Sequence, residues 1–314
     1  MNLLLAFMIF MKSVIYGLSV FFTGTLVKTV DVLDVLALRF LMSFVVLYIL
    51  KSLKVIRIET GIRDLAKKKE EKEYVKALLL AGIFEPVLYM FFETMGISMT
   101  TGITAGVILA VSPVFSCINE AIFLKEKSTL MQKIFLGIGM AGVMYIAVMT
   151  NTDDGQNTVS GIVFMFLAVI SGTLYSVFSR KSSKHFQAFE VTYITCFLGT
   201  VVFNLINVVR HLLDGDVLRY FAPYMSFENL IGFAYLSILS TIVATAMNNY
   251  ALSRVHVSTV AAFGGVSTLV TIAAGIFLNH EKLYGFQVIG ILLIIIRMVG
   301  VSYIDIQKQK QSVK

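Results

Sequence analysis

The chain has 314 residues, of which 57% are hydrophobic and only 14% charged. Soluble domains carry about 25% charged residues, so this composition excludes an ordinary water-soluble protein and indicates a chain that is almost entirely membrane domain. The net charge of +7 does not indicate a nucleic-acid partner, because the basic residues gather in particular loops without an aromatic and basic binding patch. Cys117 and Cys196 lie in apolar stretches, which argues against a disulfide framework.

About ten apolar segments follow one another along the chain, each close to the roughly 20 residues that a spanning helix needs. They lie at residues 3–22, 32–50, 75–95, 102–124, 131–149, 159–179, 191–209, 230–251, 257–278 and 285–304. The N-terminus lacks the basic region and cleavage site of a signal peptide, so we expect the first segment to be retained as a helix. The sequence therefore predicts an all-α integral membrane protein.

The charge of the loops predicts the orientation of these helices. Most Lys and Arg residues fall in alternate loops, above all in the charged stretch at about 51–76. The other set of loops holds few basic residues, namely Lys28, Arg210, Arg219 and Lys282. Because basic loops stay on the cytoplasmic side, we expect both termini to be cytoplasmic.

Two stretches of the chain resemble each other. Residues 96–127 align without a gap on residues 251–282. The matched positions include Ser98 with Ser253, Thr104 with Thr259, Ser112 with Ser267, Glu126 with Glu281 and Lys127 with Lys282. An internal repeat in a multi-span protein indicates two structural halves around a transport path. Five segments per half is an odd number, so the sequence predicts a 5+5 inverted repeat with halves at 1–150 and 151–314.

Motifs spread over nearly the whole chain, at 36–40, 89–101, 112–115, 123–127 and 277–282, point to a known family. In order and spacing they resemble the EamA type of the drug/metabolite transporter superfamily. The resemblance implies ten helices and alternating-access movement of small organic solutes, commonly export across the plasma membrane. The chain departs from the pattern at Tyr16-Gly17, where Trp-Gly is usual, and at Arg297, where a small residue is expected.

Ionisable side chains inside the predicted spans are the first candidates for function, because such groups are costly in a membrane and face a cavity or a partner. Judged by position along the helices, they form pairs of opposite charge at matching depth. These pairs are Lys12 with Glu85 near the middle, Arg39 with Glu93 in the outer quarter, and Glu120 with Arg297 in the inner half. Depth alone does not establish contact.

Glu85 is the leading candidate for the substrate site. A carboxylate at mid-membrane can carry a proton or bind a cationic amine of a solute. The alternative is a static ion pair between Glu85 and Lys12 that holds two helices together. Pro86 follows directly and favours the functional interpretation, because proline frees a backbone carbonyl and kinks spanning helices beside cavities.

Further side chains are expected to line the same path. Glu93 lies about 80° around the helix from Glu85, so both can face one wall; capping or pairing with Arg39 is the alternative role for Glu93. In the repeat, Glu93 aligns with Asn248, which Asn249 follows. Tyr16 and Tyr89 can offer hydroxyls and ring faces to a solute, although packed or interfacial tyrosines are commoner.

The remaining candidates are assigned structural or gating roles. We expect Arg39 to reach the outer interface by snorkelling. Glu120 and Arg297 lie close to the inner surface, so we expect both to be structural. Pro113 and the pair Gly264-Gly265 lie in the central helix of each repeat. They provide either flexible points for a rocking movement or close helix packing.

The sequence thus predicts a secondary-active transporter in a bacterial plasma membrane, most simply an exporter of a small metabolite or amino acid-like solute. Its expected partners are the solute, protons and the lipid bilayer, with a homodimer left open. No Walker motif is present and the histidines lack metal-ligand spacing, so neither ATP nor a cofactor or metal is expected.

Two other functions stay open at this point. Efflux of cationic drugs would be favoured by an acidic cavity that Lys12 or Arg39 does not compensate. A membrane-embedded enzyme acting on lipids is a remote alternative. It would need a catalytic cluster at one interface, and because the sequence shows none we do not expect an enzyme.

Overall fold

The computed structural model describes residues 3–59, 72–125, 130–149, 158–293, 295–296 and 300, which form helices and loops with no strand among them. In this part of the chain, eight helices are long and apolar enough to cross a membrane. They are Leu4–Leu26, Val32–Ser52, Lys72–Ser98, Gly102–Leu124, Val159–Ser182, Ala188–Asp214, Phe227–Arg254 and Val257–Phe277. Within the described residues, the prediction of an all-α chain with many spanning helices is confirmed.

The first half begins with two uninterrupted helices, α1 (Leu3–Leu26) and α2 (Val32–Ser52). Asp31 starts α2 by accepting a hydrogen bond from the Leu33 N–H at 2.9 Å. The third span is divided into α4 (Lys72–Gly82), the π-helix η2 (Ile83–Leu88) and α5 (Tyr89–Ser98). The fourth is divided into α6 (Gly102–Leu109), α7 (Ser112–Asn119) and the π-helix η3 (Glu120–Leu124), and α8 (Leu130–Met149) follows.

Residues 158–293 contain a similar series of elements. It begins with α9 (Val159–Ser182) and α10 (Ala188–Asp214), and two short 3-10 turns follow, η5 (Val217–Arg219) and η6 (Ala222–Met225). The next span consists of α11 (Phe227–Ala234), the π-helix η7 (Tyr235–Ala244) and α12 (Thr245–Arg254). The last complete one consists of α13 (Val257–Ala262) and α14 (Gly264–Phe277), after which residues 285–293 are again helical.

Interruptions fall at related places in the two halves. Glu85 has φ −143° and ψ 121°, extended values that break the helix just before Pro86, and η7 occupies the corresponding span of the second half. The next spans are broken between α6 and α7 and between α13 and α14. Pro113 lies in the first turn of α7, where its missing N–H costs no helix bond. The sequence predicted kinks or flexible positions at Pro86, at Pro113 and at Gly264-Gly265, but not in η7.

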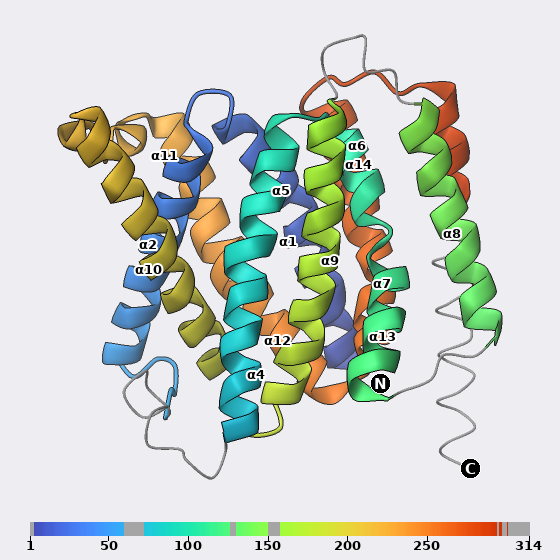
Figure 1. The fold of residues 1–314 in the computed structure, drawn as a ribbon, viewed down its shortest axis with the longest axis horizontal. Coiled ribbons are helices and arrows are strands. Elements are labelled where there is room, and N and C mark those ends of the chain that lie inside the picture. The colour runs from blue at the N-terminus through green and yellow to red at the C-terminus, as the bar shows by residue number, and fades with distance from the viewer. Residues whose placement is uncertain are drawn as a thin grey trace.

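The packing of the helices also corresponds between the halves. α1 packs against α14 and α9 packs against α7, while α2 and α10 pack against each other. α6 contacts α14 near one end of the molecule, and α7 contacts α13 near the other. Figure 1 shows that α6 starts and α14 ends at the top of the view, and we call this the α6 end of the molecule. α13 lies at the bottom, where α1 begins, and we call this the α13 end.

A polar network fastens α2 to α10. The Asp34 carboxylate accepts hydrogen bonds from Asn207 Nδ2 at 2.8 Å and Arg210 Nη2 at 2.9 Å, and it lies 2.9 Å from His211 Nε2. His211 Nδ1 lies 2.6 Å from Asp216 Oδ1 on the other side of the ring. These residues lie at helix ends, where charges are common, so their sequence does not predict the network.

Candidate functional site

A cavity of about 150 Å³ lies at the level of the helix interruptions and takes side chains from both halves. Its polar lining residues are Lys12, Ser13, Tyr16, Ser19, Glu85, Tyr89, Glu93, Ser112, Ser116, Thr173, Ser176, Ser240, Asn248, Ser267, Thr268 and Thr271. Six of the seven side chains predicted to bind substrate are therefore in one place: only Asn249 is elsewhere. A space of this size is sufficient for several water molecules or one small solute.

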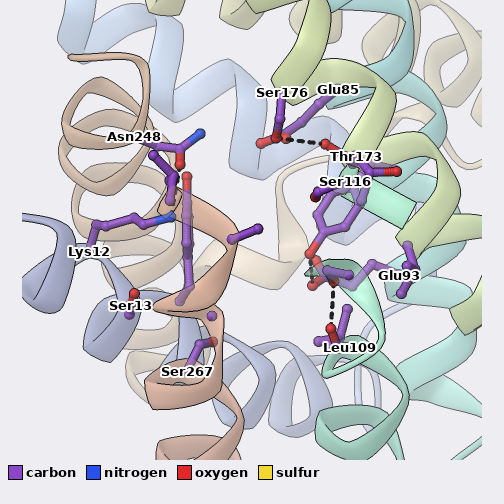
Figure 2. A pocket seen from close by; sticks show the side chains of 18 of the residues that line it. Lys12, Ser13, Glu85, Glu93, Leu109, Ser116, Thr173, Ser176, Asn248 and Ser267 are labelled. Carbon is purple, nitrogen blue, oxygen red and sulfur yellow. Dashed lines mark hydrogen bonds between the residues drawn. The ribbon is translucent and has the colours of Figure 1, made fainter. Parts of the chain in front are cut away.

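Lys12 and Asn248 lie on one side of this cavity (Figure 2). The Lys12 side chain is buried, and its Nζ donates a hydrogen bond to Asn248 Oδ1 at 2.8 Å. Nζ also lies 5.7 Å from the centroid of the Tyr16 ring, and the Tyr16 hydroxyl lies 3.1 Å from Thr245 Oγ1. The ammonium group is therefore held by an amide oxygen and an aromatic face, and the predicted ion pair with Glu85 is not formed.

Glu85 lies on the opposite side of the cavity (Figure 2), where the break in the helix places it. Its side chain is half-buried, and no group among the described residues forms a hydrogen bond or an ion pair with its carboxylate. A charged carboxylate without a partner is costly at membrane depth. Glu85 is therefore available to a proton or to a cationic group that enters the cavity.

Glu93 has a partner within its own helix. It is 5% exposed and accepts a hydrogen bond from the Tyr89 hydroxyl at 2.6 Å. The interruption upstream leaves α5 itself regular, so Tyr89 and Glu93 are one turn apart and face the same way. The predicted pair of Glu93 with Arg39 is not formed.

The prediction that the Arg39 side chain snorkels to the interface is wrong, because the side chain is buried inside the protein. It is only 1% exposed, and it donates from Nε to Thr241 Oγ1 at 2.9 Å and from Nη2 to Ser240 Oγ at 3.1 Å. Both hydroxyls belong to η7, whose Ser240 also lines the cavity. The guanidinium group is thus buried directly behind the cavity wall.

The prediction that Asn249 lines the substrate site is also wrong, because this residue is not among those that line the cavity. Its Oδ1 accepts hydrogen bonds from the Tyr175 hydroxyl at 2.6 Å and Ser179 Oγ at 2.8 Å, and its Nδ2 donates to Thr192 Oγ1 at 3.0 Å. Consecutive residues point about 100° apart on a helix, so only one of two neighbours faces a given cavity. Asn249 instead fastens α12 to α9 and α10.

Five of the predicted structural or gating residues lie at helix ends or interruptions, namely Pro86, Pro113, Glu120, Gly264 and Gly265. Glu120 binds the start of α13 through the Val257 and Ser258 N–H groups, and its Oε1 is 3.4 Å from Arg180 Nη1. Arg297, its predicted partner, lies outside the described residues, as do Glu126 and Lys127 of the repeat.

Comparison with known proteins gives the family. The profile of the EamA-like transporter family matches residues 3–148 and, a second time, residues 159–303. The chain belongs to the EamA-like transporter family. It is 33% identical to the uncharacterized transporter YcxC of Bacillus subtilis (strain 168) over 95% of this chain and 92% of that protein. It is also 24% identical to an uncharacterized transporter of Archaeoglobus fulgidus over 70% of this chain and 74% of the relative.

A solved structure also shares the fold. A crystal structure of another protein superposes on this chain with a TM-score of 0.67, at 14% sequence identity. The match covers 97% of this chain and 98% of the other. That likeness shows the fold alone. The family resemblance predicted from the sequence is confirmed, and the chain is a multi-pass membrane transporter.

The cavity of this EamA-family transporter contains many hydroxyl side chains that the sequence analysis missed. Ser and Thr are common in spanning helices because they can bond to the carbonyl one turn back, as Ser13 does to Ile9 O at 2.8 Å and Ser176 to Gly172 O at 3.0 Å. Their sequence signal is therefore the same whether they face a cavity or a neighbouring helix.

The charges around the cavity balance. Glu85 and Glu93 contribute two carboxylates, Lys12 lines the same space, and Arg39 lies behind Ser240. Among these four residues no ion pair within 4.0 Å is formed, although all of them lie close to one small space. Such an arrangement leaves opposite charges on separate walls of the cavity.

Proposed function

We propose that the chain is a secondary-active exporter of a small metabolite or amino acid-like solute, which it moves by alternating access through this cavity. The observation that carries the proposal is the position of Glu85, which has no partner among the described residues, across the cavity from the Lys12–Asn248 pair. A solute that carries an amine and a carboxylate can place its cationic group at Glu85 and its anionic group at Lys12 and Asn248. Hydroxyl side chains offer further hydrogen bonds along the walls.

The proposed energy source is a proton gradient acting through Glu85. Its carboxylate can be neutralised by a proton or by the solute amine, and the two compete for the same oxygens. Binding of a proton from one side would then release the solute, and loss of the proton on the other side would allow the next solute to bind.

The proposed architecture is a ten-helix, 5+5 inverted repeat with halves at 1–150 and 151–314 and cytoplasmic termini. Support comes from the two ranges that match the family profile and from the π-helices η2 and η7 in corresponding spans. α6 and α13 also start at opposite ends of the molecule (Figure 1). We place the protein in a bacterial plasma membrane, and a homodimer stays a prediction.

The alternatives receive less support. Efflux of cationic drugs would be favoured by an acidic cavity without compensating cations, whereas here Lys12 lines the cavity and Arg39 lies directly behind its wall. Membership of a transporter family also favours transport over a lipid-modifying enzyme.

Transport in proteoliposomes tests this function. Wild type, Glu85→Gln and the exposed control Glu228→Gln are given a mixed pool of amino acids, nucleosides and organic amines, with and without a pH gradient. We expect one solute class to move with the gradient in wild type and in the control, and the gradient dependence to be lost in Glu85→Gln. Full transport with unchanged pH dependence in Glu85→Gln would contradict the coupling role, and movement of organic cations alone would favour drug efflux.

A further inference from the structure

The start of α6 is bound by a carboxylate from the loop that follows α14. Glu281 Oε1 accepts a hydrogen bond from the Gly102 N–H at 3.0 Å, and Oε2 accepts one from the Ile103 N–H at 2.9 Å. The first N–H groups of a helix lack partners within the helix and carry partial positive charge, so a carboxylate there is stabilising. We call these contacts the Glu281 clamp.

The same arrangement occurs at the opposite end of the molecule with the two halves exchanged. Glu120, at the end of α7, accepts hydrogen bonds from the Val257 N–H at 3.0 Å and the Ser258 N–H at 3.2 Å, at the start of α13. Arg180 Nη1 lies 3.4 Å from Glu120 Oε1 and adds a contact from α9. We call these contacts the Glu120 clamp.

The two clamps lie on either side of the helix interruptions. α6 packs on α14, and α7 packs on α13. The interruptions between these pairs are at Ala110-Val111 and at Phe263, and the adjoining Ser112 and Gly264 line the cavity. Separating α6 from α14 would therefore open the cavity toward the α6 end without moving α7 away from α13, and the converse holds at the α13 end.

We propose that the two clamps are the gates of the transport path, each of which must break for the cavity to open at its own end. The proposal rests on the proposed alternating-access transport. With the N-terminus in the cytoplasm, the Glu281 clamp closes the outer mouth and the Glu120 clamp closes the inner mouth. Both gates use the same chemistry, a carboxylate on two N–H groups, which an inverted repeat would supply once at each mouth.

A glycine lets the Glu281 carboxylate approach its site. A Cβ placed on Gly275 would lie 2.9 Å from Glu281 Oε2, closer than such contacts normally come. Gly275→Ala therefore displaces the carboxylate without removing it. This substitution gives a second way to weaken the Glu281 clamp while the charge of the chain stays the same.

Accessibility of a thiol in the cavity tests the gates without any knowledge of the solute. Cys117 and Cys196, the two cysteines of the chain, are replaced by Ser, and Ser176→Cys provides a reporter in the cavity wall. A small membrane-impermeant methanethiosulfonate is applied to intact cells for the outer side and to inside-out vesicles for the inner side. The measured quantity is the ratio of the outer to the inner labelling rate.

We expect Glu281→Ala to raise this ratio about tenfold and Glu120→Ala to lower it about tenfold, since each substitution removes two charge-assisted hydrogen bonds from one gate. Glu281→Gln keeps one acceptor and should give a smaller rise, and Gly275→Ala should also raise the ratio. In a variant that carries both Glu281→Ala and Glu120→Ala, the opposite shifts of the labelling ratio should largely cancel. Thermal unfolding of each purified variant identifies any that fail to fold. If Glu281→Ala fails to fold, the labelling ratios of Glu281→Gln and Gly275→Ala test the outer gate instead.

Exposed carboxylates at the two ends serve as matched controls. Glu228→Ala at the start of α11 and Glu73→Ala at the start of α4 should leave the ratio unchanged. Equal ratios in wild type, Glu281→Ala and Glu120→Ala, or shifts in the same direction, would overturn the gates even if proteoliposomes show transport. Opposite shifts without transport of any solute would support the gates and contradict the proposed exporter.

Discussion

Adjacent residues of α12 have different roles because they point in different directions. Asn248 lines the cavity and holds Lys12, whereas Asn249 is fully buried and joins Tyr175, Ser179 and Thr192. The sequence placed both in the substrate site, since two neighbouring polar residues in an apolar span look alike. The helix period separates them, but only the packing of α12 decides which of the two faces the cavity.

Substitution of these two residues should separate binding from stability. Asn249→Ala leaves the hydroxyls of Tyr175 and Ser179 without their acceptor, and we expect it to lower the free energy of unfolding by about 1 to 2 kcal/mol. Asn248→Ala should instead raise the KM for the solute several-fold, because Lys12 loses the group that positions it. Denaturant unfolding in detergent and transport assays measure the two effects. A loss of stability confined to Asn248→Ala would contradict the assignment.

The charged residues show how far sequence reasoning extends in a membrane. The cost of burying a charge identified Lys12, Glu85 and Glu93 as candidates for a cavity, and the structure places all three around one. Their pairing could not be predicted, because depth along a helix says nothing about the direction in which a side chain points. The Arg39 guanidinium donates its hydrogen bonds to hydroxyls of η7. No sequence motif predicts a π-helix, so this contact could not be foreseen.

At the scale of elements, α1 and α14 approach closely at a single glycine. The Thr271 hydroxyl donates a hydrogen bond to Gly17 O at 2.9 Å, and a Cβ at Gly17 would lie 2.6 Å from Val270 Cβ and 2.7 Å from Ser267 O. The contact joins the first helix of one half to a cavity-lining helix of the other. The close approach leaves no room for a side chain at position 17.

This contact predicts a difference between two glycines of α1. Gly17→Ala should cost about 1–3 kcal/mol, because the methyl group forces α14 away. Gly24→Ala is the matched control: its Cβ would meet Ile97 Cγ2 at 3.5 Å, an ordinary contact, so we expect stability close to wild type. Thermal unfolding in detergent compares the two. Equal stability of both variants would show that α1 and α14 are not packed this closely.

Helix interruptions were predictable in part. Pro86 and Pro113 indicated two of them because proline cannot donate the helix hydrogen bond, and both interruptions adjoin these residues. The π-helix η7 contains no proline, and no feature of its sequence predicted it. The gapless repeat also matched Glu126 to Glu281, whereas the carboxylate found on the start of α13 is that of Glu120. The alignment of the two repeats matches residues of similar type, and it does not show which side chain reaches the start of a helix.

For the whole molecule, the proposed orientation places the loop between α10 and α11 outside and the loop between α9 and α10 inside. In a chain without its two native cysteines, we expect Leu218→Cys to react with an impermeant maleimide on intact cells. Lys184→Cys should react only after the membrane is made permeable. Both positions are exposed, so access to the reagent depends on the side of the membrane alone. Labelling of Lys184→Cys on intact cells would contradict cytoplasmic termini.

The balanced charges around the cavity determine how the membrane potential acts on each step of a cycle. With Lys12, Arg39, Glu85 and Glu93 all ionised, the empty cavity carries no net charge, and its reorientation is insensitive to voltage. A proton on Glu85 leaves one positive charge, worth about 2.3 kcal/mol for each 100 mV that it crosses. A zwitterionic solute would cross without this bias, so the voltage would act on the return step that carries the proton and leave the export step unaffected.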